Sequence, residues 1–184
     1  LPILRYSLPG DFGFPTQLFY LDRCFMANRY KVGNSKELVL VNTHNEAFDE
    51  GGEIRKAQME SLKEFVLKEY EAGNYVIVGG DWNQYPPYFK PAFSANKSFT
   101  GVIGNFNLTG IESDYMPGEW TWIYDQTTPS VRTLMAAYDP ATTPTSVCDI
   151  FLVSPNIESV SVKCHHLGFA SSDHNPVIIQ VKLK

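Results

Sequence analysis

The chain has little of what would assign it to a membrane or to a disulfide-stabilised scaffold. In its 184 residues no apolar run approaches the roughly 18 residues of a membrane span, and no signal peptide is visible. It has only three cysteines, Cys24, Cys148 and Cys164, an odd number without the spacing of a metal motif. We therefore expect neither a disulfide framework nor a zinc site, and interpret each cysteine as a small buried hydrophobic residue.

The chain also lacks a basic run. Acidic residues outnumber basic ones by 20 to 15, which gives a formal net charge of −5. Proteins that grip the phosphate backbone carry a basic face, so broad affinity for nucleic acids is not indicated. We find no internal repeat, and the length predicts one domain, or two small ones, with a sizeable core. The sequence begins at Leu1 rather than at a Met, so localisation is left open.

The most informative stretch is residues 75–83, Tyr-Val-Ile-Val-Gly-Gly-Asp-Trp-Asn. Its four apolar residues predict a short buried strand, after which Gly79 and Gly80 allow a sharp turn. Asp81 and Asn83 stand two residues apart, so in an extended chain both would face the same side. They can point together at one substrate, or they can tie down the backbone of their own loop. This stretch alone leaves both interpretations open.

The rest of the chain predicts a mixture of strands with one helix. We expect the helix to begin at Glu53 and to end at Gly73-Asn74. Its predicted apolar face consists of Ile54, Ala57, Ser61, Leu62, Phe65 and Val66. Strands are expected at residues 24–32, 37–44, 75–78, 120–124, 149–153, 157–163 and 177–183. Residues 33–35 predict a hairpin turn, and residues 1–22, 84–119 and 125–147 are expected to be loops.

Polar side chains gather at the ends of these predicted strands. They are His44, Asp81, Asn83, Asp149, Asp173 and His174. Each alone has a plainer explanation as a cap or a turn residue. Together they contain what phosphoryl transfer to water requires: carboxylates for a hard divalent cation, a carboxylate–imidazole pair for protons, and donors for the phosphoryl oxygens.

These residues resemble motifs of the endonuclease/exonuclease/phosphatase superfamily, which includes DNase I-like nucleases and several phosphatases. The matches follow the order of the family motifs. They are Asn42-Thr43-His44, Arg55 with Gln58, Gly79-Gly80-Asp81-Trp82-Asn83, the strand at residues 149–153, and Ser172-Asp173-His174-Asn175-Pro176. Five matches in order make the resemblance specific, although no single match would.

The resemblance implies an α/β fold of the DNase I-like type, a four-layer α/β/β/α sandwich of two mixed sheets. It also exposes a departure. Such domains open with a strand that carries an Asn and, soon after, a strand end that carries a metal-binding Glu, whereas nothing before His44 matches either and residues 1–22 contain no Glu. We therefore expect residues 1–184 to be a single domain incomplete at its N-terminus, about the last two-thirds. We expect this piece alone to bind metal weakly and to be almost inactive.

The roles that the resemblance implies belong to a phosphoester hydrolase dependent on Mg²⁺ or Mn²⁺. Asp81 would orient or deprotonate the attacking water and Asn83 would fix the water or the phosphate. His174, steadied by Asp149, would stabilise the phosphoryl oxygens, although either Asp81 or His174 can be the general base. Asp173 and Asp81 would bind the metal, and His44 would hydrogen-bond the scissile phosphate.

The substrate is expected to depend on the two long loops. Candidates for contact are Tyr85, Tyr88, Trp120, Trp122 and Arg132, with packing the better interpretation for the two Trp residues. The acidic charge favours a small or lipid-borne phosphoester over duplex DNA. A DNA endonuclease of the same family and a non-catalytic binding module are the alternatives, and no protein partner can be inferred.

Overall fold

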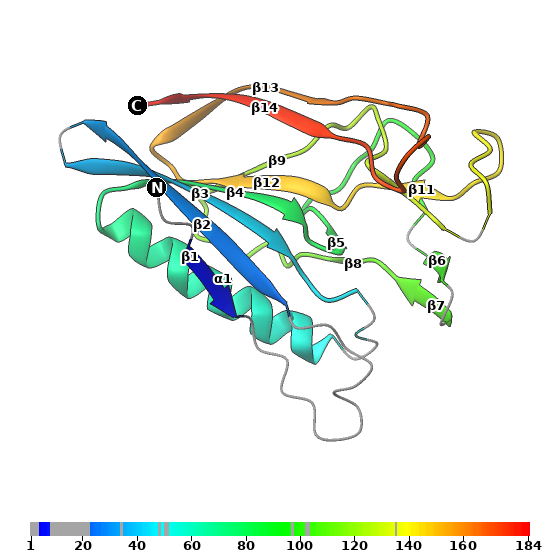
Figure 1. The fold of residues 1–184 in the computed structure, drawn as a ribbon, viewed down its shortest axis with the longest axis horizontal. Helices are drawn as coiled ribbons and strands as arrows, with labels where there is room; N and C mark the ends of the chain where they lie inside the picture. The colour runs from blue at the N-terminus through cyan, green and yellow to red at the C-terminus, as the bar shows by residue number, and fades with distance from the viewer. Residues whose placement is uncertain are drawn as a thin grey trace.

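The computed structural model describes residues 4–7, 23–33, 35–47, 49, 52–96, 98–101, 104–134 and 136–184 (Figure 1). Its largest element is a six-stranded sheet in the order β1-β2-β3-β4-β12-β9. The strands are β1 (Leu4–Ser7), β2 (Cys24–Gly33), β3 (Lys36–His44), β4 (Tyr75–Asp81), β12 (Asp149–Val153) and β9 (Thr121–Ile123). β3 and β4 are parallel and the other neighbours are antiparallel, so the sheet is mixed.

Helix α1 (Glu53–Glu71) connects β3 to β4 and covers one face of this sheet (Figure 1). The predicted helix is confirmed, and so are Leu62, Phe65 and Val66 of its core-facing side, but the rest of its buried face is not the predicted one. The buried residues are Arg55, Gln58, Met59, Leu62, Val66 and Glu69, whereas Ile54, Ala57 and Ser61 are only half-buried. Apolar periodicity missed this face because polar side chains stand at both its ends, and tertiary hydrogen bonds satisfy them. None of the described helices is long and apolar enough to cross a membrane.

A second, two-stranded sheet covers the other face (Figure 1). It pairs β13 (Ile157–Cys164) with β14 (Val177–Leu183) in antiparallel register. The predicted alternation of β14 is confirmed, since Val177, Ile179, Val181 and Leu183 are half-buried and the residues between them are exposed. This inner face packs against the side chains of β3, β4 and β12 that point away from α1.

The stacking of a helix and two sheets confirms the predicted α/β, DNase I-like sandwich. Three of its four layers lie in the described residues. On the outer face of the second sheet, Val160 and Ile178 are 61% and 54% exposed, and no helix of the described ranges covers them.

The regions expected to be loops contain short strands. Residues 4–7 form β1, and pairs of strands lie within 84–119 and 125–147. These are β5 (Gln84–Tyr85) with β8 (Thr109–Gly110), β6 (Ser98–Gly101) with β7 (Gly104–Asn107), and β10 (Val131–Arg132) with β11 (Thr145–Ser146). Strands of two to four residues are too short for an alternation to be recognised. The remainder of the predicted N-terminal loop, residues 8–22, and Asn34 in the predicted hairpin turn lie outside the described residues.

Side-chain alternation assigns a face to every residue of the central strands. In β4, Val76 and Val78 point toward α1, and Tyr75 and Ile77 point toward the second sheet. Continuing that alternation, Gly79 and Asp81 belong to the face of the second sheet. Gly79 is required there, since a Cβ on it would stand 2.5 Å from the ring of Phe151. Gly80 has φ +148, and a Cβ on it would collide with the carbonyl oxygen of Thr43.

Candidate active site

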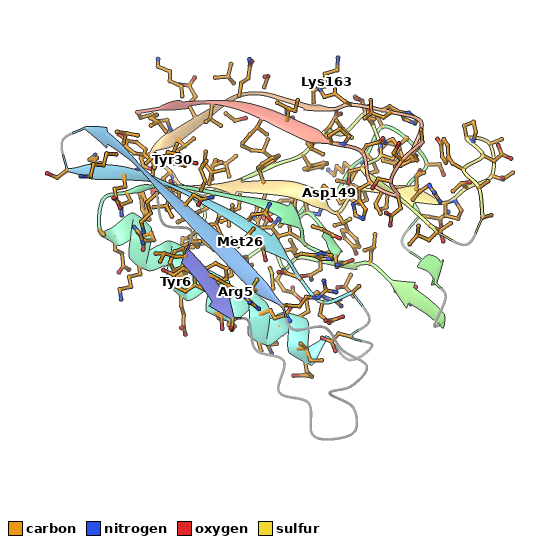
Figure 2. The ribbon with its side chains drawn as sticks, viewed as in Figure 1. Arg5, Tyr6, Met26, Tyr30, Asp149 and Lys163 are labelled. Atoms are coloured by element: carbon orange, nitrogen blue, oxygen red, sulfur yellow. The ribbon has the colours of Figure 1, made fainter. Side chains whose placement is uncertain are left out.

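The registers of three strands place three of the predicted residues side by side. His44 pairs with Asp81 across β3 and β4, and Asp149 pairs with Asp81 across β12 and β4. By the alternation of their strands all three lie on the face toward the second sheet, and Figure 2 shows Asp149 at the end of β12. A bridge between Val131 and His174 brings the segment before β14 to the same edge. Residues far apart in sequence thus meet at one end of the sheet.

His174 is held by Asp149. Its Nδ1 lies 2.8 Å from Oδ2 of Asp149, which also accepts a hydrogen bond of 2.7 Å from the hydroxyl of Ser130. Ser130 in turn accepts from the backbone N–H groups of Cys148 and Asp149. A proton on Nδ1 is therefore fixed toward Asp149, and Nε2 of His174 faces the other carboxylates. Ser130 was not among the predicted residues, because a serine within a loop of low periodicity carries no signal.

Asp81 uses its two oxygens differently. Oδ1 accepts a 2.8 Å hydrogen bond from the backbone N–H of Asn83. Oδ2 lies 3.4 Å from Nε2 of His44 and 3.7 Å from Nε2 of His174. One oxygen therefore ties down the loop, as the second interpretation of the sequence predicted, and the other faces the two histidines.

Asn83 departs from the predicted geometry. Its φ is +49, so the backbone is left-handed rather than extended, and Asn83 does not share the face of Asp81 by strand alternation. Its side-chain N–H donates 2.8 Å to the carbonyl oxygen of Asn45, whose own N–H donates to the carbonyl of Asp81. Asn83 therefore joins the end of β4 to the residue after His44. Its contact with a phosphate stays a prediction.

Burial and the neighbouring charges shift the pKa values of Asp81, His174 and His44. Burial, reinforced by the charge of Asp149, raises the pKa of Asp81. Burial opposes a charged His174, but its hydrogen bond with Asp149 and the charges of Asp149, Asp81 and Asp173 outweigh it and raise its pKa to about 9. Burial lowers the pKa of His44, against the charge of Asp81. At neutral pH, His174 is thus a cation held between carboxylates.

The predicted metal ligands flank the same imidazole. Oδ2 of Asp81 and Oδ2 of Asp173 each lie 3.7 Å from Nε2 of His174. Their side chains are 14% and 30% exposed. Carboxylate oxygens are the ligands that Mg²⁺ and Mn²⁺ prefer, usually together with water. The donor types at this edge therefore fit a hard divalent cation.

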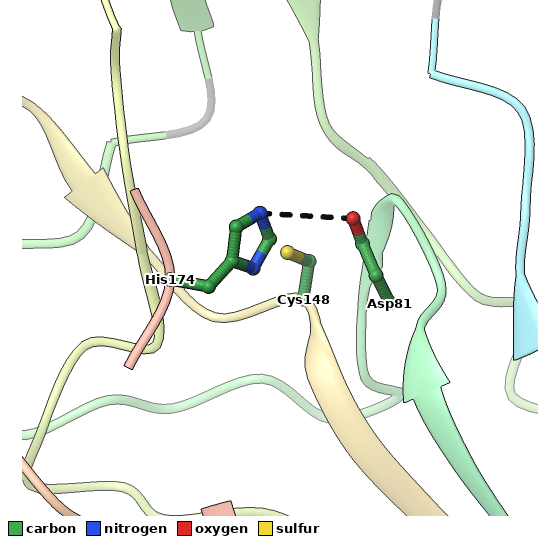
Figure 3. Close-up of side chains that lie close together, drawn as sticks. All are labelled: Asp81, Cys148 and His174. Atoms are coloured by element: carbon green, nitrogen blue, oxygen red, sulfur yellow. Dashed lines mark ion pairs between the residues drawn. The ribbon is translucent and has the colours of Figure 1, made fainter. Parts of the chain in front are cut away.

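Cys148 is, with Ser130, a residue of the cluster that was not among the predicted site residues. It is buried as expected, but its Sγ lies 3.7 Å from Oδ2 of Asp149. Ligand atoms of Asp81, Cys148 and His174 all lie within 4.8 Å of one another. Figure 3 shows the sulfur between the imidazole and the carboxylate. Burial and the neighbouring carboxylates raise the pKa of the Cys148 thiol. Its one sequence signal was its position directly before Asp149.

Arg55 and Gln58 act on the loop after His44. The Gln58 side chain accepts a 2.9 Å hydrogen bond from the N–H of Glu46, and the guanidinium of Arg55 donates 2.9 Å to the carbonyl of Glu46. The Glu46 carboxylate is buried and pairs with Arg23 at 3.2 Å. Asp49 accepts from the N–H groups of Gly52 and Arg55 at the start of α1. Glu46 and Asp49, the two acids of this loop that the structure describes, are therefore engaged inside the protein.

A cleft of about 570 Å³ between the two sheets leads to the cluster. Its walls include Leu40, Ile77 and Phe151, and Asp149 and His174 stand at its polar end. Of the predicted substrate contacts, Trp120 is buried and packs on Tyr70, and Trp122 packs on Trp82, so packing is confirmed for both. Of the others, Tyr85 stacks on Phe89 and Tyr88 is 77% exposed. The side chain of Arg132 donates to backbone carbonyls, while its backbone N–H donates 2.9 Å to the carbonyl of Asp173.

No protein-family model and no curated protein matches the chain, but solved structures do. One is ANGEL2, a 2′,3′-cyclic phosphatase in complex with adenosine-2′,3′-vanadate (TM-score 0.59, 13% identity, 100% of this chain and 67% of that chain). Two others are endonuclease/exonuclease/phosphatase proteins. The one from Bacteroides vulgatus has a TM-score of 0.55 and 18% identity, over 100% of this chain and 66% of that chain. The one from Beutenbergia cavernae has a TM-score of 0.53 and 15% identity, over 99% of this chain and 44% of that chain.

These similarities show that the chain has the endonuclease/exonuclease/phosphatase fold, as its motifs predicted. The chain spans between 44% and 67% of the length of these three structures.

Proposed function

We propose that the protein hydrolyses a phosphoester with the help of a divalent cation. One observation carries the proposal: His174, held by Asp149 at 2.8 Å, faces Asp81 at 3.7 Å. Attack of water on phosphorus needs a group that takes up a proton and positive groups around the non-bridging oxygens. The chain has both at the end of one sheet. The fold supports the proposal, since a solved structure with this fold is a 2′,3′-cyclic phosphatase.

The pKa shifts favour a division of roles between Asp81 and His174. A raised pKa makes Asp81 a stronger base than an ordinary carboxylate. A pKa of about 9 leaves His174 protonated at neutral pH, so it cannot take a proton from water there. We therefore assign the general base to Asp81, while His174 donates to the phosphoryl oxygens. Asp149 and Ser130 are positioning residues for His174.

The metal would be held by Asp81 and Asp173. A bound Mg²⁺ or Mn²⁺ neutralises phosphate charge and orients the substrate. His44 supplies a further donor, since its side chain is 56% exposed and its Nε2 already faces the carboxylate of Asp81. Asn83 ties the end of β4 to the end of β3, because its side chain donates to the carbonyl of Asn45, whose N–H donates to the carbonyl of Asp81.

For the substrate we favour a small or lipid-borne phosphoester over duplex DNA. The support is the net charge of −5, because a duplex is bound by neutralising several phosphates. Glu46 and Asp49 add little to this argument, because both are engaged inside the protein. The apolar walls of the cleft beside Asp149 and His174 accommodate an acyl or aromatic group better than a second phosphate strand.

The test offers the purified protein plasmid DNA, a sphingomyelin vesicle and bis(p-nitrophenyl) phosphate, each with Mg²⁺, with Mn²⁺ and with EDTA. We expect metal-dependent release of product that Asp81→Asn abolishes. These assays use the full gene product. The 184-residue chain is assayed beside it, and we expect that chain alone to be almost inactive.

Three outcomes would contradict parts of this proposal. Turnover that persists in EDTA would contradict the proposed dependence on a metal. Turnover that is unchanged in Asp81→Asn would contradict the assignment of Asp81 as the general base. DNA nicking that dominates and weakens steeply with salt would reverse the substrate preference. If no substrate turns over but phosphoesters bind, the chain is a binding module.

A further inference from the structure

We propose that Asp81, Cys148 and His174 form a binding site for a thiophilic metal ion, Zn²⁺ above all, within the candidate active site. Three ligand atoms of different chemistry, an oxygen, a sulfur and an imidazole nitrogen, lie within 4.8 Å of one another (Figure 3). They come from three separate segments: the end of β4, the residue before β12 and the loop before β14.

The distances are close to those of a tetrahedral site. Zn²⁺ binds nitrogen and oxygen at about 2.0–2.2 Å and sulfur at about 2.3 Å, so neighbouring ligand atoms in a tetrahedron lie roughly 3.3–3.7 Å apart. Nε2 of His174 lies 3.7 Å from Oδ2 of Asp81. The sulfur needs a side-chain adjustment of up to about 1.5 Å to complete the set, since the three ligand atoms lie within 4.8 Å of one another.

The imidazole is already oriented as a metal ligand. Its Nδ1 is engaged by Asp149 at 2.8 Å, which leaves Nε2 as the coordinating atom. A histidine that binds metal usually donates its other nitrogen to a carboxylate in this way, and that partner raises the basicity of the ligand. Ser130 holds the carboxylate of Asp149 in turn at 2.7 Å. The arrangement therefore includes the outer support of a metal site as well as its ligands.

The sulfur decides which metal this site prefers. Mg²⁺ and Mn²⁺ take oxygen ligands, whereas thiolate and imidazole select Zn²⁺ and related ions. Coordination would release two protons to solvent, one from the buried Cys148 thiol and one from Nε2 of the imidazolium of His174. The three side chains leave the fourth position of a tetrahedron for water or a phosphate oxygen.

The consequence of this site rests on the proposed function. Asp81 and His174 are the base and the cationic donor assigned above, and Zn²⁺ would occupy both. Zn²⁺ would therefore inhibit hydrolysis supported by Mg²⁺, and Cys148 would be the residue that confers this sensitivity. Binding of Zn²⁺ itself does not depend on whether the protein is a hydrolase.

Binding is tested first, with Co²⁺ as a spectroscopic substitute for Zn²⁺ and a phosphine reductant that keeps the thiols reduced. We expect a thiolate-to-cobalt charge-transfer band in the near ultraviolet that Zn²⁺ abolishes. Cys148→Ser should lose the band and at least about tenfold of the Zn²⁺ affinity measured by calorimetry. The matched control is the double variant C24S/C164S, in which Cys148 is the only cysteine left; it should keep the band.

X-ray absorption of the wild-type Zn²⁺ complex needs no variant, so it decides the question even if Cys148→Ser does not fold. We expect one sulfur at about 2.3 Å together with nitrogen and oxygen neighbours. A shell of nitrogen and oxygen alone, or a charge-transfer band that survives in Cys148→Ser and vanishes in C24S/C164S, would overturn the site. Neither result touches the proposed hydrolysis, which is measured separately with Mg²⁺.

Discussion

The two faces of the six-stranded sheet are packed differently. On the face toward α1, the side chains of Val39, Leu62, Val66, Val76 and Val78 have no accessible surface. On the face toward β13 and β14, most packed side chains are half-buried, and a cleft of about 570 Å³ remains. The first face is the more tightly packed of the two. The second has the open space, and His44, Asp81 and Asp149 belong to that face at the end of their strands.

The largest expected effect is on activity, when a charge is removed from the face toward β13 and β14. Asp81→Asn should lower kcat/KM by about 10²–10⁴-fold, because it removes the assigned base. Stability should not fall. The pKa of Asp81 is raised in the folded protein, so the ionised carboxylate costs stability as pH rises through that pKa, and the amide removes this cost. Turnover assays and urea unfolding at pH 7 measure the two effects, and a loss of stability would contradict the separation.

The second prediction compares one apolar truncation on each face. Leu62→Ala should cost about 2–5 kcal/mol of unfolding free energy, because it leaves a cavity in the tightly packed face. Ile179→Ala should cost only about 1–2 kcal/mol, because that side chain is half-buried. Urea unfolding of both variants is the measurement. Equal costs would show that the two faces are packed alike.

The third prediction is the pH dependence of kcat/KM. Activity needs Asp81 ionised and His174 protonated, so it should rise through the raised pKa of Asp81 and fall tenfold per unit above about pH 9. Asp149 is the largest of the influences that raise the pKa of His174 against the effect of burial. Asp149→Asn removes the charge of Asp149, so the pKa of His174 should fall and the alkaline limb of the profile should move to lower pH. An alkaline limb that does not shift in Asp149→Asn would contradict the role of Asp149 as a positioning residue for His174.

The smallest expected effect is at His44. His44→Gln should lower kcat/KM by about tenfold, which corresponds to one hydrogen bond to a charged phosphate. Its side chain is 56% exposed, so the free energy of unfolding should hardly change. The control is His166→Gln on the exposed loop before β14, which should leave both quantities unchanged. Equal losses of kcat/KM in the two variants would contradict the role of His44 as a donor to the phosphate.

Features that depend on short-range regularity could be predicted from the sequence. The β-branched run at residues 75–78 predicted β4, and the helix after residue 52 predicted the crossover that makes β3 and β4 parallel. Once those strands are parallel, polar residues that end them meet at one edge. This is why His44 and Asp81 could be placed together from the sequence alone.

Features that could not be predicted depend on contacts distant in sequence or on a single backbone angle. The left-handed φ of Asn83 reversed the expected direction of its side chain. Glu46 is buried because Arg23 reaches it from 23 residues away. The absence of cysteine spacing argued against zinc, but spacing says nothing about residues that strand pairing brings together, and Cys148 reaches His174 only through β12 and the loop before β14.

Trp82 lies between Asp81 and Asn83, on the opposite side of the chain from the candidate site. It has no accessible surface, its indole donates 3.0 Å to the carbonyl of Ile150, and its ring meets Trp122 edge to face at 5.0 Å. Its backbone N–H donates to the carbonyl of Cys148, so the indole is tied to two of the three proposed zinc ligands through neighbouring peptide bonds. A displacement of either strand end changes the surroundings of this indole. We therefore expect the intrinsic fluorescence of the chain, to which Trp82, Trp120 and Trp122 contribute, to change when the site is occupied.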